Sequence, residues 1–544
     1  MANATFARLV LERAGDDHPG LLFEDETRTW AQVVHAARAR AALLAGVPGP
    51  PGRPRHVGVL LENVPEYVFW ILGAALAGAT VVGINPTRRG AELAADVRHT
   101  DCDLIVTDTA HAGLLETDLP ALLVDSAGYR AALPADPPGP DVSAIAPGDR
   151  LLLLFTSGST GTPKAVVCSQ GRLAAIAGRA DLMGIGRDSV AYCAMPLFHG
   201  NAIMANLAMA VRTGATVALR RRFSASGFLP DVRRYRATYF NYVGRALAYI
   251  LATPEGPDDA GNTLRAAFGT EASAQDLARF GARFGCRIIE GYGSSEGAIA
   301  LRKTPDTPPD ALGLPAHGTE VAVLDPATGA ECARARFDGG GRLANPGEAI
   351  GELVGLNVAA AFEGYYNDPE ATAERVRDGR YWSGDLGYRD EAGFFYFAGR
   401  GADRLRVDSE NFAAAPVERI LARWPEAVMC AVYPVPDPRT GDQVMAALEL
   451  RGGFDPAAFA AFLAAQPDLG TKWAPRFVRI VAAMPLTATG KVDKKPLRRA
   501  GWTTGDPVWW RPGRDLAYEP LGEDAAGWLV GEFAEHRRTH LPVW

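Results

Sequence analysis

The feature that most constrains the fold is an alternation of short apolar segments with longer amphipathic ones along the N-terminal half of the chain. Strands that alternate with helices form parallel sheets whose two faces are covered by helices. We therefore predict an α/β architecture. Its predicted strands are HVGVLL (56–61), TVVGI (80–84), LIVT (104–107), LLLLFT (151–156), TVALR (216–220) and CRIIEGY (286–292).

The pattern changes near residue 312, where shorter apolar segments are separated by frequent turns. The segments EVAVLD, GELVG and FFYFAGR indicate a mostly antiparallel sheet or barrel. After Arg400, a helix at PVERILARW and strands at VMCAVYPV and QVMAALEL indicate a small α+β domain that ends in the basic stretch GKVDKKPLRR. Pro- and Gly-rich breaks at 47–54, 135–141 and 304–310 predict surface loops or joints.

Length and composition bound the class of protein. A chain of 544 residues predicts two to four domains, at about 100–200 residues per domain. With 48% hydrophobic and 22% charged residues, the composition is that of an ordinary globular protein. The net charge of −7 gives no general attraction to nucleic acid or to anionic lipid. Any site for an anion must therefore be local.

Cysteine usage and the N-terminus indicate a reducing compartment. The six cysteines are far apart and include no C-x-x-C pair, which argues against a zinc site and against a secreted disulfide framework. In MANATFARLVLERAGDD, charges at Arg8, Glu12 and Arg13 interrupt the apolar stretch, so this segment predicts an amphipathic helix and not a signal peptide. We predict a cytoplasmic location.

The segment 67–84 (YVFWILGAALAGATVVGI) is uncharged over a length at the threshold for a membrane-spanning helix. Its first part has Ala and Gly at helical spacing, and its end is the β-branched run TVVGI before Asn85-Pro86. We therefore predict a buried helix followed by a buried strand.

The strongest local motif is LLLLFTSGSTGTPKAVV, a buried strand that runs into a glycine- and hydroxyl-rich loop ending in Lys164. Glycines allow close approach of the backbone to an anion, hydroxyls and amides donate hydrogen bonds, and the lysine adds positive charge. Pro163 before the lysine and Ala165 after it exclude the G-x-x-x-x-G-K-[ST] loop. The predicted phosphate-binding residues are Thr156, Ser157, Gly158, Ser159, Thr160, Gly161 and Lys164.

Lysine is rare in this chain, with six lysines among 56 basic residues. A lysine within a Gly-rich loop therefore indicates a need for a compact ammonium group. Lys491 has a similar setting in PLTATGK (485–491), a turn that would present one ammonium group at its tip.

Taken together, the motifs identify a family. TSGSTGTPK, GYGSSEG (291–297), YWSGDLG (381–387), GR (399–400) and PLTATGK occur in this order. Over nearly all of residues 1–500, the chain resembles the adenylate-forming superfamily of acyl-CoA synthetases, adenylation domains and luciferases. The stretches 242–257 and 401–411 look most like the branch of very-long-chain acyl-CoA synthetases and fatty-acid transport proteins.

This resemblance implies an α/β multidomain fold. Residues 1–399 would form a large AMP-binding domain of two doubly wound αβαβα subdomains and a distorted β-barrel. Residues 400–404 would be a hinge and 405–500 a small, mobile α+β lid domain. The tail 501–544 carries five of the ten tryptophans, and the sequence does not predict its role.

The resemblance also implies two half-reactions. A carboxylate attacks the α-phosphate of ATP to give an acyl-adenylate and pyrophosphate, and a thiol, that of coenzyme A, then attacks the acyl carbonyl. Because the first two reactants are both anions, charge neutralisation is the main catalytic task. By resemblance, the loop at 156–164 holds the β- and γ-phosphates, Glu296 holds Mg²⁺, and Lys491 brings the carboxylate and the α-phosphate together.

The other site residues come from matching motif positions. Asp385 would accept hydrogen bonds from the ribose hydroxyls and Arg400 would donate to the same sugar. Ser295 replaces the family's usual threonine and keeps its hydroxyl. The residues implied to bind the nucleoside are Gly269, Thr270, Glu271, Gly291, Tyr292, Gly293, Ser295, Asp385 and Arg400.

His199, in MPLFHGN, matches the family's gate between the nucleotide and the acyl pocket. Small residues in that pocket would suit a bulky lipophilic acid, whether fatty, steroid-side-chain or terpenoid. The implied pocket residues are Asn201, Asn241, Tyr242, Val243 and Gly244, with Gly269 shared with the nucleoside site.

Two departures from the family pattern concern the second half-reaction. Ala402 stands at the hinge position, where Asp or Lys is frequent, and a small residue can absorb a large change in φ and ψ. Ser409 replaces a common glycine before Glu410 and Asn411, in the segment assigned to the thioester step.

The sequence therefore predicts an AMP-forming acid:CoA ligase that uses ATP, Mg²⁺ and coenzyme A. A stand-alone enzyme that loads a carrier protein is the alternative, and an ATP- or lipid-binding protein on an inactive scaffold is the non-enzymatic one. The predicted partners are small molecules and not nucleic acid. The prediction includes no membrane-spanning segment, and it leaves room for a homodimer and for transient membrane contact.

Overall fold

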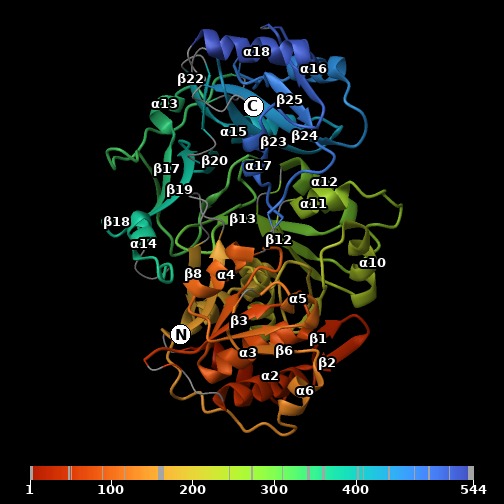
Figure 1. The fold of residues 1–544 in the computed structure, drawn as a ribbon, viewed down its shortest axis with the longest axis vertical. Helices are drawn as coiled ribbons and strands as arrows, with labels where there is room; N and C mark the ends of the chain where they lie inside the picture. Colours follow the sequence, from red (N-terminus) through yellow and green to blue (C-terminus); the bar gives the residue numbers. More distant parts are fainter. Residues whose placement is uncertain are drawn as a thin grey trace.

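The structure is a computed structural model. It describes residues 4–46, 50, 52–88, 90–115, 117–156, 164–243, 245–270, 272, 274–308, 310–339, 343–357, 362–400, 404–407, 410–438, 442–470, 472–487, 490–513 and 515–536. Figure 1 shows the early chain, in red and orange, at one end of the long axis and the C-terminal part, in blue, at the other. The strands between residues 321 and 400, described below as the third sheet, lie between these two ends and are coloured from green to cyan.

The first sheet has the strand order β6-β5-β3-β4-β7-β8, in which β8 is antiparallel to β7 and the other pairs are parallel. Its strands are β3 (His56–Leu60), β4 (Thr80–Gly83), β5 (Leu104–Thr107), β6 (Ala121–Leu123), β7 (Arg150–Thr156) and β8 (Lys164–Ser169). The helices in this part are α2 (Trp30–Ala45), α3 (Pro65–Ala77), α4 (Gly90–His99), α5 (Thr109–Ala112) and α6 (Ala127–Ala132).

The uncharged segment 67–84 forms most of α3 and all of β4. Pro65 occupies the first turn of α3, and Gly78 ends the helix with a left-handed φ of 64°. The β4 strand that follows is buried along its whole length. The prediction of a buried helix and a buried strand is confirmed, and among the described residues no helix is long and apolar enough to cross a membrane.

The second sheet has the order β15-β14-β13-β12-β11-β9-β10-β1-β2, and its strands from β13 to β1 run parallel. They are β1 (Pro19–Phe23), β2 (Glu26–Thr29), β9 (Val190–Cys193), β10 (Thr216–Leu219), β11 (Tyr239–Val243), β12 (Ala266–Thr270), β13 (Arg287–Gly293), β14 (Ala300–Arg302) and β15 (Leu314–Pro315). The helices are α1 (Phe6–Leu11), α7 (Gln170–Ala177), α8 (Gly200–Ala202), α9 (Ala208–Thr213), α10 (Ala225–Tyr235), α11 (Arg245–Leu251) and α12 (Ala274–Phe284), with a 3₁₀ turn at Ala180–Met183 and a π-helix at Ile203–Leu207.

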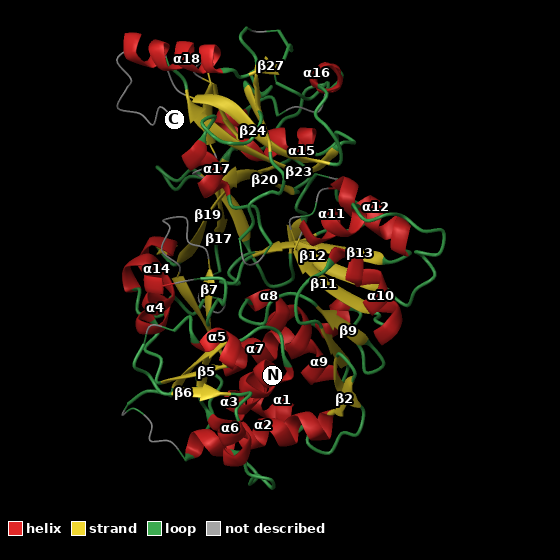
Figure 2. Ribbon diagram, turned by 45° about the vertical axis from the view of Figure 1, so that its right-hand side comes forward, coloured by secondary structure: helices red, strands yellow, loops and turns green. Residues whose placement is uncertain are grey.

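The third sheet is antiparallel, as the change of pattern near residue 312 predicts. Its strands are β16 (Val321–Leu324), β17 (Gly351–Gly355), β18 (Val376–Arg377), β19 (Arg380–Arg389) and β20 (Phe395–Arg400), with α13 (Pro346–Ala349) and α14 (Pro369–Arg375) beside them. Figure 2 shows β17 and β19 extending between the first sheet and the C-terminal part.

The C-terminal part contains the hairpin β21-β22 and the sheet β23-β24-β25-β26-β27. The strands are β21 (Arg404–Val407), β22 (Glu410–Ala413), β23 (Ala427–Pro436), β24 (Asp442–Leu450), β25 (Phe477–Ile480), β26 (Val508–Trp510) and β27 (Glu519–Pro520). The helices are α15 (Ala414–Leu421), α16 (Pro456–Ala464), α17 (Lys494–Ala500) and α18 (Glu523–Glu535).

The Trp-rich tail completes this C-terminal sheet. Strand β26 pairs with β25, and Trp502 stacks on Phe477 with ring centroids 5.0 Å apart. Trp510 and Phe533 are buried in the same core cluster. Ala248 of α11 also belongs to that cluster, so the C-terminal part packs against the second sheet's helices through an apolar contact.

Candidate active site

The site forms where strands of the first and second sheets end. Parallel strands present their carboxyl ends at one edge of a sheet, and α/β proteins bind ligands beyond that edge. Strands β11, β12 and β13 end at Val243, Thr270 and Gly293, and β7 of the first sheet ends at Thr156. Residues that are far apart in the sequence are thereby brought together.

Thr156 and Lys164 close the stem of the Gly-rich loop. The two residues are partners across the antiparallel β7-β8 pair, and the Thr156 hydroxyl lies 3.5 Å from the Lys164 carbonyl oxygen. The predicted phosphate-binding residues Ser157, Gly158, Ser159, Thr160 and Gly161 lie outside the described residues.

Lys164 is buried against groups from two later segments. Its Nζ lies 5.3 Å from the centroid of the Tyr365 ring and 3.6 Å from Glu374 Oε2. The Tyr365 hydroxyl donates a hydrogen bond of 2.9 Å to Oε1 of Glu296, which is itself buried. Lys164 and Glu296, the predicted metal-binding carboxylate, therefore both contact Tyr365.

Arg172 and Gly297 hold the turn that carries Glu296 in its conformation. Arg172 of α7 donates a hydrogen bond of 2.5 Å to the Ser295 carbonyl oxygen. Gly297 has a φ of +72°, and a Cβ atom there would lie 2.6 Å from Arg172 Nη2. A side chain at Gly297 would therefore strain the backbone and displace the arginine.

Tyr292 and Asp385 connect two motifs that the sequence separates widely. The Tyr292 hydroxyl donates a hydrogen bond of 2.6 Å to Asp385 Oδ2. Asp385 is also the cross-strand partner of Arg400 in the β19-β20 pair, although the Arg400 side chain is not among the described ones. Gly291 and Gly293 flank Tyr292 and pair with β14. Glu271 lies outside the described residues.

Tyr242 packs over the end of β12. A Cβ at Gly269 would lie 2.4 Å from the Tyr242 ring, so the register of β11 and β12 requires a glycine there. The Tyr242 hydroxyl donates a hydrogen bond of 2.5 Å to Glu290 Oε2, and burial raises the pKa of Tyr242. Val243 is buried and lies opposite Thr270 in the same pair of strands, and Gly244 lies outside the described residues.

Three asparagine side chains, two of which are predicted acyl-pocket residues, form a chain of hydrogen bonds. Asn206 donates to Asn241 over 2.7 Å, and Asn241 donates to Asn201 over 2.8 Å. Asn206 and Asn241 are fully buried, whereas Asn201 is partly exposed.

A backbone carbonyl sets the direction of this asparagine chain. Asn206 Nδ2 lies 3.2 Å from the Tyr192 carbonyl oxygen, which can only accept a hydrogen bond. The amide nitrogen of Asn206 must therefore lie there, and the orientations of Asn241 and Asn201 follow in turn. The partly exposed end of the chain is consequently a donor, Nδ2 of Asn201.

His199 is the N-cap of α8, and its Nδ1 accepts a hydrogen bond of 3.5 Å from the Asn201 backbone nitrogen. A Cβ at the next residue, Gly200, would lie 3.5 Å from Ser295 Oγ. The histidine predicted to be a gate is therefore next to a residue that contacts the GYGSSEG turn.

Lys491 closes a turn, as its motif predicts. Thr487 N donates to the Lys491 carbonyl oxygen over 2.7 Å, and Gly490 has a left-handed φ of 77°. Leu486 and Val492 flank the turn and pack against the core cluster that includes Ala248 of α11. Ala402 and Ser409 lie outside the described residues, and Glu410 and Asn411 lie in β22 with side chains that are not described.

Several residues of this site were not predicted from the sequence. Tyr365 occurs in GYYN, which is typical of a turn, and Asn206 lies within an apolar helical run. Arg172 is one arginine among many. Buried polar side chains need partners, so the isolated Asn206 in a core helix was the available signal.

The fold and these groups define a nucleotide-binding α/β enzyme with a small C-terminal domain. The chain belongs to the AMP-binding enzyme family: residues 9–366 match the description of AMP-binding enzymes, and residues 416–491 match that of the AMP-binding enzyme C-terminal domain.

The chain is similar to named CoA ligases over nearly its whole length. It is 52% identical over 558 residues to steroid-22-oyl-CoA synthetase from Rhodococcus jostii (strain RHA1), with 99% of each chain covered. It is 48% identical over 516 residues to medium/long-chain-fatty-acid–CoA ligase FadD17 from Mycobacterium marinum (strain ATCC BAA-535 / M), covering 93% of this chain and 98% of that protein.

Among solved structures, the crystal structure of the anthranilate CoA ligase AuaEII in complex with anthranoyl-AMP has a TM-score of 0.79. The two chains are 21% identical, and the match covers 92% of this chain and 98% of that one. This likeness supports the predicted fold, with its large N-terminal and small C-terminal parts.

Proposed function

We propose that this protein is an ATP-dependent acid:CoA ligase for a bulky lipophilic carboxylic acid. The acid is activated as acyl-AMP, the acyl group is transferred to coenzyme A, and AMP and pyrophosphate are released. The observation that carries the proposal is the convergence of the motif residues: Lys164 with Glu296 around Tyr365, and Tyr292 with Asp385.

The charges of the site fit the first half-reaction. Lys164 is a buried ammonium group at the stem of the Gly-rich loop, where it would neutralise phosphate oxygens. Asp385 would accept hydrogen bonds from the ribose hydroxyls, with Arg400 on the adjacent strand donating to the same sugar. Lys491 would draw the substrate carboxylate and the α-phosphate together against their mutual repulsion.

Glu296 fits a hard divalent cation. One carboxylate oxygen is engaged by Tyr365, and the other has no hydrogen-bond partner among the described residues. A carboxylate oxygen that shares its cation with substrate phosphates is the usual ligand set of Mg²⁺. When bound, Mg²⁺ would neutralise negative charge on the phosphates.

The acyl side supports a substrate that is lipophilic yet recognised near its carboxyl end. Asn201 of the proposed pocket is hydrogen-bonded to His199, the proposed gate, and accepts a hydrogen bond from Asn241. The other proposed pocket residues, Tyr242, Val243 and Gly244, follow Asn241 in the sequence. The relatives are named for steroid and for medium- or long-chain fatty acids. The partly exposed Asn201 amide offers one donor to an oxygen of the acid.

The cysteines and the remaining partners complete the proposal. All six cysteines are free, which supports a reducing, cytoplasmic setting.

The proposed partners are ATP, coenzyme A and the acid. Ala402 would serve as the hinge and the segment with Ser409, Glu410 and Asn411 would serve the thioester step. A homodimer and transient membrane contact are compatible with this account.

One assay tests the proposal. The purified protein is incubated with ATP, Mg²⁺, coenzyme A and a panel of fatty, steroid-side-chain and terpenoid acids, and AMP and acyl-CoA are quantified. We expect both products in equal amounts for at least one class of acid. Absence of both products for every acid would contradict the proposal. Replacing coenzyme A by a carrier protein in the same assay tests the alternative acceptor.

A further inference from the structure

Residues 363–367 form a segment that is tied to the strand leaving the Gly-rich loop. Tyr366 N donates to the Ala165 carbonyl oxygen over 2.8 Å, and Val167 N donates to the Gly364 carbonyl oxygen over 3.1 Å. Tyr365 forms an antiparallel bridge with Val166. The segment 363–367 thus extends the edge of the first sheet at β8, the strand that Lys164 begins.

Tyr365, the first tyrosine of this segment, contacts the candidate site. Tyr365 donates its hydroxyl proton to Oε1 of Glu296 over 2.9 Å. The face of the Tyr365 ring lies against Lys164, and an aromatic face attracts a cation. One side chain therefore orients the carboxylate and packs against the loop lysine.

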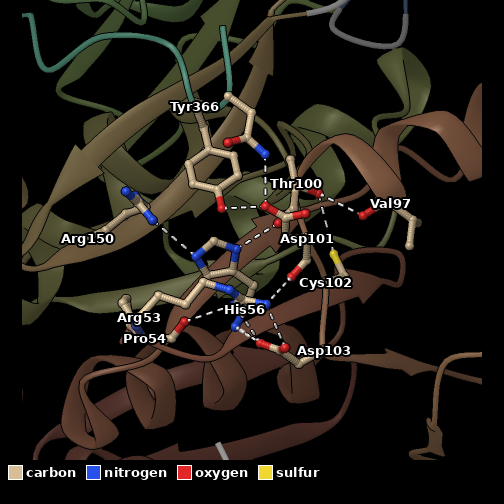
Figure 3. A network of polar contacts seen from close by, with 11 residues as sticks. Arg53, Pro54, His56, Val97, Thr100, Asp101, Cys102, Asp103, Arg150 and Tyr366 are labelled. Atoms are coloured by element: carbon tan, nitrogen blue, oxygen red, sulfur yellow. Dashed lines mark hydrogen bonds and ion pairs between the residues drawn. The ribbon is translucent and has the colours of Figure 1, made fainter. Parts of the chain in front are cut away.

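Tyr366, the second tyrosine, also donates its hydroxyl to a carboxylate, but it faces away from the site. Successive side chains of an extended segment point in opposite directions. The Tyr366 hydroxyl donates a hydrogen bond of 2.7 Å to Asp101 Oδ2, and its ring packs against Arg150 at 4.5 Å. Figure 3 shows Tyr366 in this network, above His56 and between Arg150 and Asp101.

We propose that Tyr365 is a positioning residue that sets the affinity of the site for the divalent cation accompanying ATP. It holds Oε1 of Glu296 in a fixed place relative to β8 and leaves Oε2 directed to a cation. Because the segment 363–367 is hydrogen-bonded to β8, the carboxylate is positioned relative to Lys164, the first residue of that strand. This inference rests on the proposed function, in which Glu296 binds the cation.

The ring and the hydroxyl of Tyr365 have separate roles, because the ring contacts Lys164 and the hydroxyl contacts Glu296. A phenylalanine at this position keeps the ring face beside Lys164 and loses only the hydrogen bond to Glu296. Metal-free nucleotide binding depends on the lysine and should not change. The affinity gained from the cation depends on the carboxylate and should decrease.

The experiment compares Tyr365→Phe with Tyr366→Phe as a matched control. Each substitution removes one hydroxyl from one tyrosine–carboxylate hydrogen bond, of 2.9 Å and 2.7 Å respectively. Calorimetric titration measures the affinity for a non-hydrolysable ATP analogue, once with EDTA and once with excess Mg²⁺. The readout is the ratio of the two affinities, and Glu296→Gln is measured in parallel.

We expect Tyr365→Phe to lower this ratio about tenfold, the effect of losing one hydrogen bond to a charged group, with the EDTA affinity unchanged. Tyr366→Phe should match the wild type in both conditions. A wild-type ratio for Tyr365→Phe, or an equal loss in both variants, would overturn the inference. If Glu296→Gln also keeps the wild-type ratio, the assignment of Glu296 as the metal ligand fails. If the ratio falls in Glu296→Gln but stays at the wild-type value in Tyr365→Phe, only the role of Tyr365 is refuted.

Discussion

At the scale of single residues, His56 shows how neighbours fix a protonation state. Its ring is fully buried, with Nδ1 2.7 Å from the Thr100 carbonyl oxygen and Nε2 3.2 Å from Arg150 Nη1. The carbonyl only accepts and the guanidinium only donates, so the ring is neutral with its proton on Nδ1. Burial lowers the pKa of His56, with Arg53 and Arg150 adding to the effect and Asp103 opposing it.

This arrangement predicts a pH dependence of stability. Below the ordinary histidine pKa of 6.5, the unfolded chain binds a proton at His56 and the folded chain does not. The free energy of unfolding should therefore decrease as the pH falls below 6.5, by at most about 1.4 kcal/mol per pH unit for this one group. His56→Gln should flatten this slope. Urea unfolding at pH 5, 6 and 7 checks the prediction, which an unchanged slope in the variant would contradict.

The asparagine chain predicts an effect confined to one substrate. Asn241→Leu would leave Asn206 and Asn201 without their shared partner, at a cost of about 1–3 kcal/mol in the free energy of unfolding. Because Asn201 and Asn241 are proposed acyl-pocket residues, KM for the acid should rise severalfold, while KM for ATP stays constant. Steady-state kinetics with each substrate varied separately decide this. A parallel rise in both KM values would point to general distortion.

The sequence suggested residue roles only where a motif carried them. Residue chemistry suggested the Gly-rich loop and Lys491, and the resemblance suggested Glu296, Asp385 and Arg400. Tyr365 and Asn206 could not be recognised in this way, because their roles arise from contacts across more than thirty positions of sequence, such as Tyr365 with Glu296. A tyrosine in a turn and an asparagine in a helix have no local pattern that reveals such partners.

At the scale of elements, the strands were predictable where burial is continuous. LIVT at 104–107 coincides with β5, and TVALR and CRIIEGY contain β10 and most of β13. The role of the tail was not predictable, because β26 is three residues long and β27 is two. Such short strands form because they pair, directly or in turn, with the edge strand β25, and their own sequence is too short to show a strand periodicity.

The tail predicts a stability effect. A chain truncated after Gly505 lacks β26, β27 and α18, and with them the buried side chains Trp510, Leu529 and Phe533. Each contributes about 1.5–3 kcal/mol by burial, so the sum is comparable to the total stability of a domain. We expect the truncated protein to unfold at a temperature lower by ten degrees or more, or to aggregate, and thermal unfolding measures this. A truncated protein as stable as the full chain would contradict the packing role.

At the scale of the whole molecule, the candidate site draws residues from three sheets. Lys164 stands on the first sheet, Tyr292 lies on β13 of the second with Glu296 after it, and Asp385 lies on the third. Lys491 belongs to the C-terminal part, which packs on α11 beside the second sheet through the cluster that contains Ala248. This distribution explains why no single segment of the sequence suggests the candidate site, whereas five motifs in order identify the family.

The central claim is that an ammonium group from the C-terminal part joins two anions bound by the N-terminal part. The most direct test is acid-dependent exchange of pyrophosphate into ATP by Lys491→Ala, with Lys495→Ala, an exposed lysine four positions later, as the control. We predict that Lys491→Ala lowers the exchange rate by at least about 100-fold while the affinity for an ATP analogue stays within about threefold. The control should match the wild type. Wild-type exchange by Lys491→Ala would contradict the account.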